Sequence, residues 1–195
     1  PNLSLESQDL DARTSSAMAA ASSAPSSSSS SSLEGGEAPG GYLFLAEKRQ
    51  GAFAVGIDVD GKGGAALPLR RICVSEPAAA GDAVYMESVE SRHSDHAFAR
   101  RVAEDSGITV EPLRLDSQVK YGVIAAGRAS AFMRFPEESY REKIWDHAAG
   151  AIIMSEAGGV VTDATGKQLD FSKGRILNNE NGIVAAPPNL HKRLI

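Results

Sequence analysis

Residues 145–163 read WDHAAGAIIMSEAGGVVTD, and this segment carries the clearest structural pattern in the chain. From Ile144 onward its apolar residues recur at helical spacing, and the Gly-Gly pair at 158–159 predicts the end of that helix. Residues 160–162 then predict a strand, and residues 164–166 a turn. The apolar residues expected to share one face of the helix are Trp145, Ala148, Ala149, Ile152, Ile153 and Ala157.

The segments before and after it extend this alternation of helices and strands. Residues 42–46 and 51–55 are apolar runs around four polar residues, which predicts a hairpin. Residues 94–105 predict a helix that a leading Ser-Asp pair can cap, whereas residues 123–126 fit a strand or a helix equally. Interleaved strands and helices favour a layered α/β fold. Further strands are expected at residues 71–75, 83–86 and 183–186.

The composition limits the classes of protein to which the chain can belong. A length of 195 residues with 42% hydrophobic residues suffices for one domain with a real core, or for two small ones. The single cysteine, Cys73, excludes a disulfide framework and a cysteine metal cluster, so we expect a reducing compartment. No apolar run approaches the roughly 18 residues of a membrane-spanning helix. The net charge of −5 argues against binding to a nucleic-acid backbone.

The first 40 residues differ from the rest in charge and complexity. They hold five acids against one base, so most of the net charge lies there and the remaining chain is almost neutral. Residues 22–32 contain nine serines and predict a flexible insert, because such a stretch cannot bury enough apolar surface to offset the entropy of ordering it. An organellar transit peptide is the alternative, but no arginine occurs between Thr14 and Gly40.

Asp146 is the first candidate for chemistry. It stands at or near the start of the helix predicted after Ile144, where exposed N–H groups and the helix dipole favour a negative charge. A carboxylate held in this way suits Mg²⁺, with phosphate oxygens and water completing the coordination. The structural alternative is an ordinary N-cap aspartate.

A second group of candidates could bind phosphate. Ser117 and Lys120 lie three residues apart, so a hydroxyl and an ammonium could grip one phosphate group, although such a pair is also common at strand edges. His93 precedes the helix predicted from residue 94 and could equally be a surface residue.

Arg134 is the last candidate, because it stands among apolar neighbours in the segment Met133-Arg134-Phe135-Pro136. A buried arginine needs an anionic partner or must extend its guanidinium to water. We expect that partner to be Glu137, Glu138 or a phosphate.

Several separated blocks together resemble a known family. WDHAAGAIIMSEAGG, with VVTDATGKQLDF and GRIL after it, resembles the second signature of the inositol monophosphatase-type, metal-dependent, lithium-sensitive phosphatases. MESVESRHSDH, LDSQVKYGVIAAGRASAFMRFP and YREKIWDHAAG are similar to the 3′(2′),5′-bisphosphate nucleotidases within that superfamily. The resemblance covers about residues 41–195, and residues 1–5 resemble a strand that precedes the hairpin in these enzymes.

This resemblance implies a fold and a division of the chain. The family fold is a layered αβαβα sandwich, of which this chain would be the C-terminal half, with a mixed sheet and flanking helices. Residues 1–5 would be a strand remnant of the N-terminal half, residues 6–40 a Ser-rich disordered insert, and residues 41–195 a C-terminal α/β phosphatase domain. Since the chain begins with Pro1 and not with Met, we expect it to be a processed chain or a fragment.

The resemblance also implies an activity. Asp146 would bind an active-site Mg²⁺, while His93, Ser117, Lys120 and Arg134 would contact the nucleotide and its phosphates. The reaction would be hydrolysis of the 3′-phosphate of adenosine 3′,5′-bisphosphate to AMP, with the sulfated precursor as a further candidate substrate. The partner would be a small nucleotide bisphosphate, with no nucleic acid and no membrane. The compartment stays open between the cytoplasm and an organelle such as a plastid or mitochondrion.

The chain departs from the family pattern, because the upstream glutamate pair and the aspartate that activates water in the family are absent. The first signature, D-P-[IL]-D-G-T, which carries two metal-binding aspartates and a catalytic threonine, is absent, and Asp58-Val59-Asp60-Gly61 lacks the threonine. We therefore expect no catalytic residue in this chain, which would need its missing N-terminal half for a complete site and would be inactive alone. The alternatives are a non-catalytic relative that binds a nucleotide or a partner, and an inositol phosphate or polyphosphate phosphatase.

Overall fold

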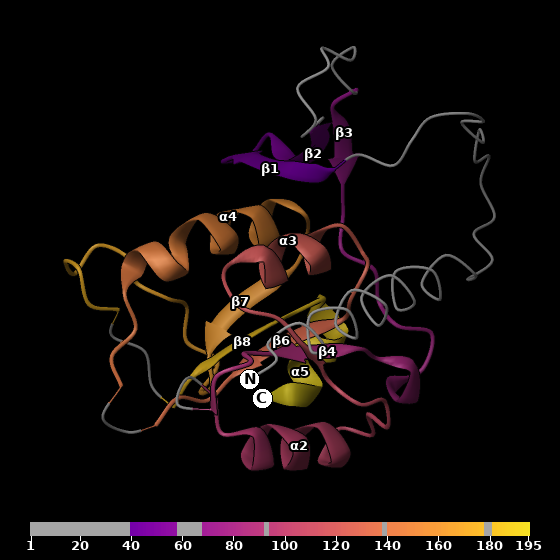
Figure 1. The fold of residues 1–195 in the computed structure, drawn as a ribbon, viewed down its shortest axis with the longest axis vertical. Coiled ribbons are helices and arrows are strands. Elements are labelled where there is room, and N and C mark those ends of the chain that lie inside the picture. Colours follow the sequence, from indigo (N-terminus) through magenta and orange to yellow (C-terminus); the bar gives the residue numbers. More distant parts are fainter. Residues whose placement is uncertain (1–39, 58–67, 92–93, 138–139, 178–180) are drawn as a thin grey trace, which may run out of the picture. The chain divides into compact units, whose positions relative to one another are not determined.

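The computed structural model describes residues 40–57, 68–91, 94–137, 140–177 and 181–195. These residues belong to one compact unit, Pro39–Ile195 (Figure 1). The strand remnant expected at residues 1–5 and nearly all of the insert expected at 6–40 lie outside the described residues. No helix in the described ranges combines the length and the apolar character that crossing a membrane requires.

A three-stranded antiparallel sheet forms from the first described residues. Its strands follow the order β1-β2-β3. The hairpin of β1 and β2 confirms the prediction, although the turn is one residue shorter than expected because β1 includes Glu47. The strand expected at 71–75 is wrong in its second half, since Val74 N donates to Ala157 O and the chain leaves the sheet there. The bounds are Gly41–Glu47 for β1, Gly51–Ile57 for β2 and Arg70–Ile72 for β3.

A second sheet of five strands is mixed, with the order β5-β4-β6-β8-β7. β4 runs parallel to β5 and β6, and β8 runs antiparallel to β6 and β7. The strands expected at 160–162 and 183–186 are confirmed, whereas the one expected at 83–86 starts two residues later. The bounds are Tyr85–Glu87 for β4, Leu113–Arg114 for β5, Ala131–Arg134 for β6, Val160–Asp163 for β7 and Ile183–Ala186 for β8.

The helices flank this second sheet. α2 confirms the predicted helix and its cap, because Asp95 Oδ1 accepts a hydrogen bond from Phe98 N at 2.9 Å. The ambiguous residues 123–126 lie almost entirely in a helix, α3. The bounds are His96–Asp105 for α2, Val119–Ala125 for α3, Ala148–Glu156 for α4 and Pro188–Leu194 for α5, with 3₁₀ turns at Ala80–Asp82 (η1) and Ile144–Asp146 (η3).

The helix predicted from Ile144 is wrong in its start and in its buried face. The chain forms the short turn η3 first, and at His147 (φ −135°, ψ −28°) the backbone leaves helical geometry before α4 begins. Trp145 is 52% exposed and Ile152 37%, so these two members of the expected stripe are not packed, whereas Ala157 is buried and Ile153 packs against the core. The residues of α4 that are buried are Gly150, Ala151 and Met154.

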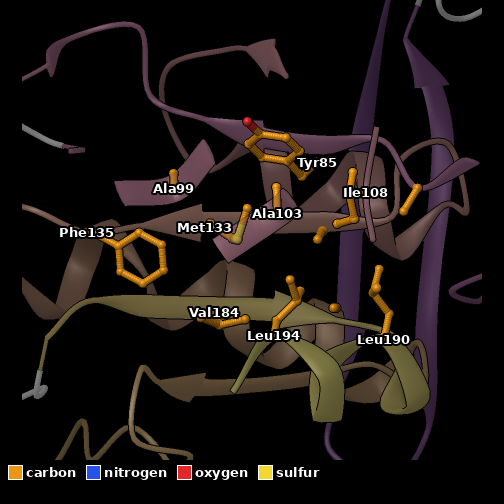
Figure 2. Close-up of a cluster of buried hydrophobic side chains, with 12 residues drawn as sticks. Tyr85, Ala99, Ala103, Ile108, Met133, Phe135, Val184, Leu190 and Leu194 are labelled. Carbon is orange, nitrogen blue, oxygen red and sulfur yellow. The ribbon is translucent and has the colours of Figure 1, made fainter. Parts of the chain in front are cut away.

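Two buried clusters cover the two faces of the five-stranded sheet. In the first, Met133 and Val184 of the sheet meet Ala99 of α2 and Leu194 of α5, as Figure 2 shows. In the second, Phe132 meets residues of α3 and α4. Both faces are therefore buried, which is typical of strands with crossover helices.

The three-stranded sheet lies on the outer side of α3 and α4 (Figure 1). The Phe44 ring packs so closely on Gly122 that a Cβ there would lie 2.7 Å from it. In addition, Glu156 at the end of α4 accepts hydrogen bonds from Arg49 N and Gly51 N. The described residues thus form helix, sheet, helix and sheet layers, which confirms the predicted layered α/β fold with a mixed sheet and flanking helices.

Candidate functional site

A pocket of about 360 Å³ lies where the parallel strands β4, β5 and β6 end. In open α/β sheets, ligands bind at the carboxyl ends of the strands. Four predicted residues meet in this pocket, Ser117, Lys120, Arg134 and Asp146, whereas His93 lies outside the described residues. The lining consists of Glu90, Asp116, Ser117, Gln118, Lys120, Tyr121, Phe132, Arg134, Tyr140, Asp146 and His147.

Gln118 joins the two segments that form most of this pocket. Its Nε2 donates to Trp145 O at 2.7 Å, and its Oε1 accepts from Gly150 N at 3.0 Å. The loop before α3 is thereby held against the start of α4. This role was not predicted from the sequence, because nothing in the local pattern shows that residues 32 positions apart face each other.

Ser117 occupies the loop in a strained conformation. Its φ of 64° is left-handed, a region that non-glycine residues rarely adopt and that clusters at functional sites. Its hydroxyl accepts a hydrogen bond from Val119 N at 3.3 Å, and its carbonyl accepts one from Lys120. The side chain lines the pocket, as a phosphate-binding role requires.

Lys120 is buried, although lysine is normally exposed. Its Nζ donates to Leu115 O at 2.8 Å and Ser117 O at 2.9 Å, and it lies 5.0 Å from the centre of the Phe132 ring. Burial, followed by the nearby Arg134 charge, lowers the pKa of Lys120 to about 8. Two carbonyls therefore hold the ammonium in place, and within the described ranges this leaves a third N–H for an anion in the pocket.

Arg134 has a partner that the sequence analysis did not name. We expected Glu137, Glu138 or a phosphate, and among the described residues the carboxylate that pairs with the guanidinium is Glu142. Glu138 lies outside the described residues, and a phosphate partner stays a prediction. Its Nε donates to Oε1 of that carboxylate, its Nη2 donates to Oε2 at 3.0 Å, and its Nη1 donates to Ser88 Oγ at 3.1 Å. Glu142 does not follow Arg134 directly in sequence, because the loop after β6 turns back before it supplies the carboxylate.

Glu142 also binds His147, which in turn binds Tyr121. His147 Nε2 lies 2.9 Å from Glu142 Oε2, and His147 Nδ1 lies 2.8 Å from Tyr121 Oη. Burial would raise the pKa of Glu142, but hydrogen bonds from His147 and Arg134 outweigh it and lower that pKa. Burial, reinforced by the Glu142 charge, raises the pKa of Tyr121. We refer to Arg134, Glu142, His147 and Tyr121 as the buried network.

Asp146 lines the pocket at the end of η3, two residues before α4 begins. A metal centre built by protein alone needs several such groups. Within the described ranges, no three His, Cys, Asp or Glu side chains are grouped so that they could hold an ion. Asp146 can therefore serve as one ligand of a hydrated Mg²⁺ that also contacts phosphate, but the described residues do not form a complete metal site.

This arrangement is suited to binding a small phosphorylated molecule. Lys120 and Arg134 provide fixed positive charges, and Ser117 provides a hydroxyl. The Phe132 ring adds apolar surface, and the volume lies in the range of small-molecule pockets.

Comparison with known proteins adds independent information. The model of the inositol monophosphatase family matches residues 38–195. A 3′(2′),5′-bisphosphate nucleotidase from Oryza sativa is 46% identical over 128 residues, which is 66% of this chain and 36% of that protein. A probable 3′(2′),5′-bisphosphate nucleotidase 4 from Arabidopsis thaliana is 42% identical over 155 residues, which is 80% of this chain and 43% of that protein.

A solved structure shows the same fold. CysQ from Bacteroides thetaiotaomicron, described as a bacterial member of the inositol monophosphatase family, aligns with a TM-score of 0.56 and 22% identity. The alignment covers 75% of this chain and 54% of CysQ. The resemblance stated from the sequence is thus confirmed, and the chain spans less than half the length of the two curated relatives.

Proposed function

Because the chain belongs to the inositol monophosphatase family, we propose that it is the nucleotide-binding part of a phosphatase acting on adenosine 3′,5′-bisphosphate. Water would displace the 3′-phosphate, giving AMP and inorganic phosphate, and the sulfated precursor would be a second substrate. The observation that carries this proposal is the meeting of Ser117, Lys120, Arg134 and Asp146 in one pocket. The names of the curated relatives support it.

In this proposal the described residues bind the substrate and orient it. Lys120 and Arg134 would attract the phosphates, and Ser117 would donate a hydrogen bond. His93, which is not among the described residues, would contact the nucleotide. Charged hydrogen bonds of this type are stronger than neutral ones. None of these side chains is proposed to attack phosphorus.

We propose that hydrolysis requires a further segment in addition to this chain. Asp146 would supply one carboxylate to Mg²⁺, which when bound neutralises phosphate charge and activates water. The remaining ligands and the catalytic residues would come from the N-terminal half, and residues 41–195 would form the C-terminal phosphatase domain, preceded by the strand remnant at 1–5 and the insert at 6–40. The compartment would be the cytoplasm or a plastid or mitochondrion.

A second candidate function is a non-catalytic nucleotide-binding protein. The observation in its favour is that no metal-binding group of three side chains occurs within the described ranges. The first candidate function predicts phosphate release once a further segment is present, and the second predicts none. Both predict that the chain binds the nucleotide.

The deciding experiment measures phosphate release from adenosine 3′,5′-bisphosphate with Mg²⁺. The chain alone should release none, and the chain preceded by the N-terminal part of the rice relative should release it. In that chimera, Asp146→Asn should abolish Mg²⁺-dependent turnover, whereas Asp170→Asn, in an exposed turn, should not. Turnover by the isolated chain would refute the need for a second half, and a near-normal rate for Asp146→Asn would refute the metal role.

A further inference from the structure

We propose that Glu142 and His147 are positioning residues that fix the Arg134 guanidinium for phosphate binding. This inference rests on the proposed function of the pocket as a phosphate site.

Hydrogen bonds to Glu142 and Ser88 restrict the orientation of the Arg134 guanidinium. Its three hydrogen bonds to Glu142 and Ser88 use three of the five N–H groups of a guanidinium. In the described part of the chain, one N–H on each of Nη1 and Nη2 is left for a ligand. Because Glu142 binds in a bidentate manner, the plane of the guanidinium is set, and so is the direction of those two N–H groups.

The Glu142 carboxylate is itself held by two side chains, Arg134 and His147. Its side chain is 1% exposed, and a buried carboxylate requires partners that offset its lost hydration. Arg134 alone would leave the carboxylate free to turn with the guanidinium. His147, itself 3% exposed, holds Oε2 from the side of α4, so the carboxylate has two fixed neighbours from separate elements.

The donors and acceptors of the two His147 hydrogen bonds follow from the charge of Glu142. Glu142 is ionised and accepts, since its hydrogen bonds lower its pKa. His147 Nε2 must therefore carry a proton and donate it. In the neutral ring, Nδ1 then accepts from the Tyr121 hydroxyl. Tyr121 cannot turn readily, because its ring is buried and meets the Phe132 ring edge-on at 5.1 Å. The hydrogen bonds therefore converge on the Glu142 carboxylate, from Tyr121 through His147 on one side and from Arg134 on the other.

Two opposite expectations make this inference testable. A simple charge argument predicts that Glu142→Gln tightens phosphate binding, because a negative charge near the ligand is removed. Positioning predicts weaker binding instead, by about tenfold, the loss expected when a charged hydrogen bond is broken. We expect the weaker binding.

The experiment uses the 195-residue chain and isothermal titration with adenosine 3′,5′-bisphosphate. Glu142→Gln and His147→Phe should each weaken binding about tenfold, while His147→Gln, whose amide can donate where Nε2 does, should restore most of the affinity. In an Arg134→Ala background, Glu142→Gln should cost nothing further, because it acts through the arginine. Tighter binding by Glu142→Gln, or an undiminished loss without Arg134, would overturn the inference.

A second measurement needs no ligand and separates this inference from the proposed function. The Arg134 Nε–H should exchange slowly with solvent in ¹⁵N NMR spectra, and His147→Phe should speed that exchange at least tenfold, unlike His147→Gln. If the wild-type chain binds no nucleotide while exchange responds in this way, the proposed function fails and the positioning role stands. Unchanged exchange in His147→Phe refutes the positioning role.

Discussion

Replacing Gly150 with alanine tests the close approach of α3 and α4 on which the pocket depends. Gly150 lies in the first turn of α4, and an added Cβ would lie 2.1 Å from Cδ2 and 2.5 Å from Cγ of Tyr121. The Gly150 N–H also donates to Gln118. A methyl group at this position therefore forces either the tyrosine ring or a whole helix to move.

Two effects of opposite sign decide the outcome. Alanine is the better helix former by about 1 kcal/mol. Overpacking a buried contact costs about 1–3 kcal/mol, and this contact is far inside van der Waals distance, so the upper end applies. Tyr121 has no easy escape, since its hydroxyl binds His147 at 2.8 Å and its ring packs on Phe132. We expect a net destabilisation of about 1–2 kcal/mol.

The assay is urea denaturation followed by the fluorescence of Trp145, the single tryptophan, whose carbonyl accepts a hydrogen bond from the same Gln118 side chain that binds Gly150 N. Ser155→Ala is the matched control, because Ser155 lies in the same helix and is exposed. It should change stability by less than about 0.5 kcal/mol. A Gly150→Ala chain as stable as wild type or more so would show that helix propensity outweighs the contact, and the reasoning would be wrong.

Two further predictions concern pH. Hydrogen bonds from Arg49 N and Gly51 N lower the pKa of Glu156, so the stability it adds is present above the pKa of an unfolded glutamate and is lost as pH falls. The advantage of wild type over Glu156→Gln in urea denaturation should thus shrink between about pH 5 and pH 3, and a constant gap would contradict this. Burial lowers the pKa of Lys120 to about 8, so the unfolded chain binds more protons above that pH and stability rises. Wild type should therefore gain stability relative to Lys120→Met between about pH 8 and pH 10, and parallel pH curves would refute the shift.

Local patterns in the sequence predicted the elements that local interactions determine. The hairpin of β1 and β2, the Asp95 cap of α2 and the end of α4 before Gly158 all depend on residues within a few positions of each other. The α/β layering followed from their order. The family resemblance brought Ser117, Lys120, Arg134 and Asp146 together as candidates, and they line one pocket.

The features that were missed depend on contacts between distant segments. The buried face of α4 contains Gly150 because Tyr121 of α3 lies against it, and no periodicity in either helix shows this. Residues 123–126 become helical because they pack in the same layer, although the run is too short for periodicity to decide. The pairing of Glu142 with Arg134 was not predicted, because the sequence spacing of the two residues does not show the turn that brings them together.

The way the pocket is held leads to a last expectation about the isolated chain. Gln118 fixes the Ser117 loop to α4, two carbonyls fix Lys120, and Glu142 fixes Arg134. Each of these bonds joins two residues of this chain, so under the proposed function we expect the binding geometry to form without a further segment. Nucleotide affinity and turnover should therefore separate, with the chain alone binding adenosine 3′,5′-bisphosphate and releasing no phosphate. If the chain alone neither binds nor hydrolyses this nucleotide, the proposed role of the pocket in nucleotide binding is refuted.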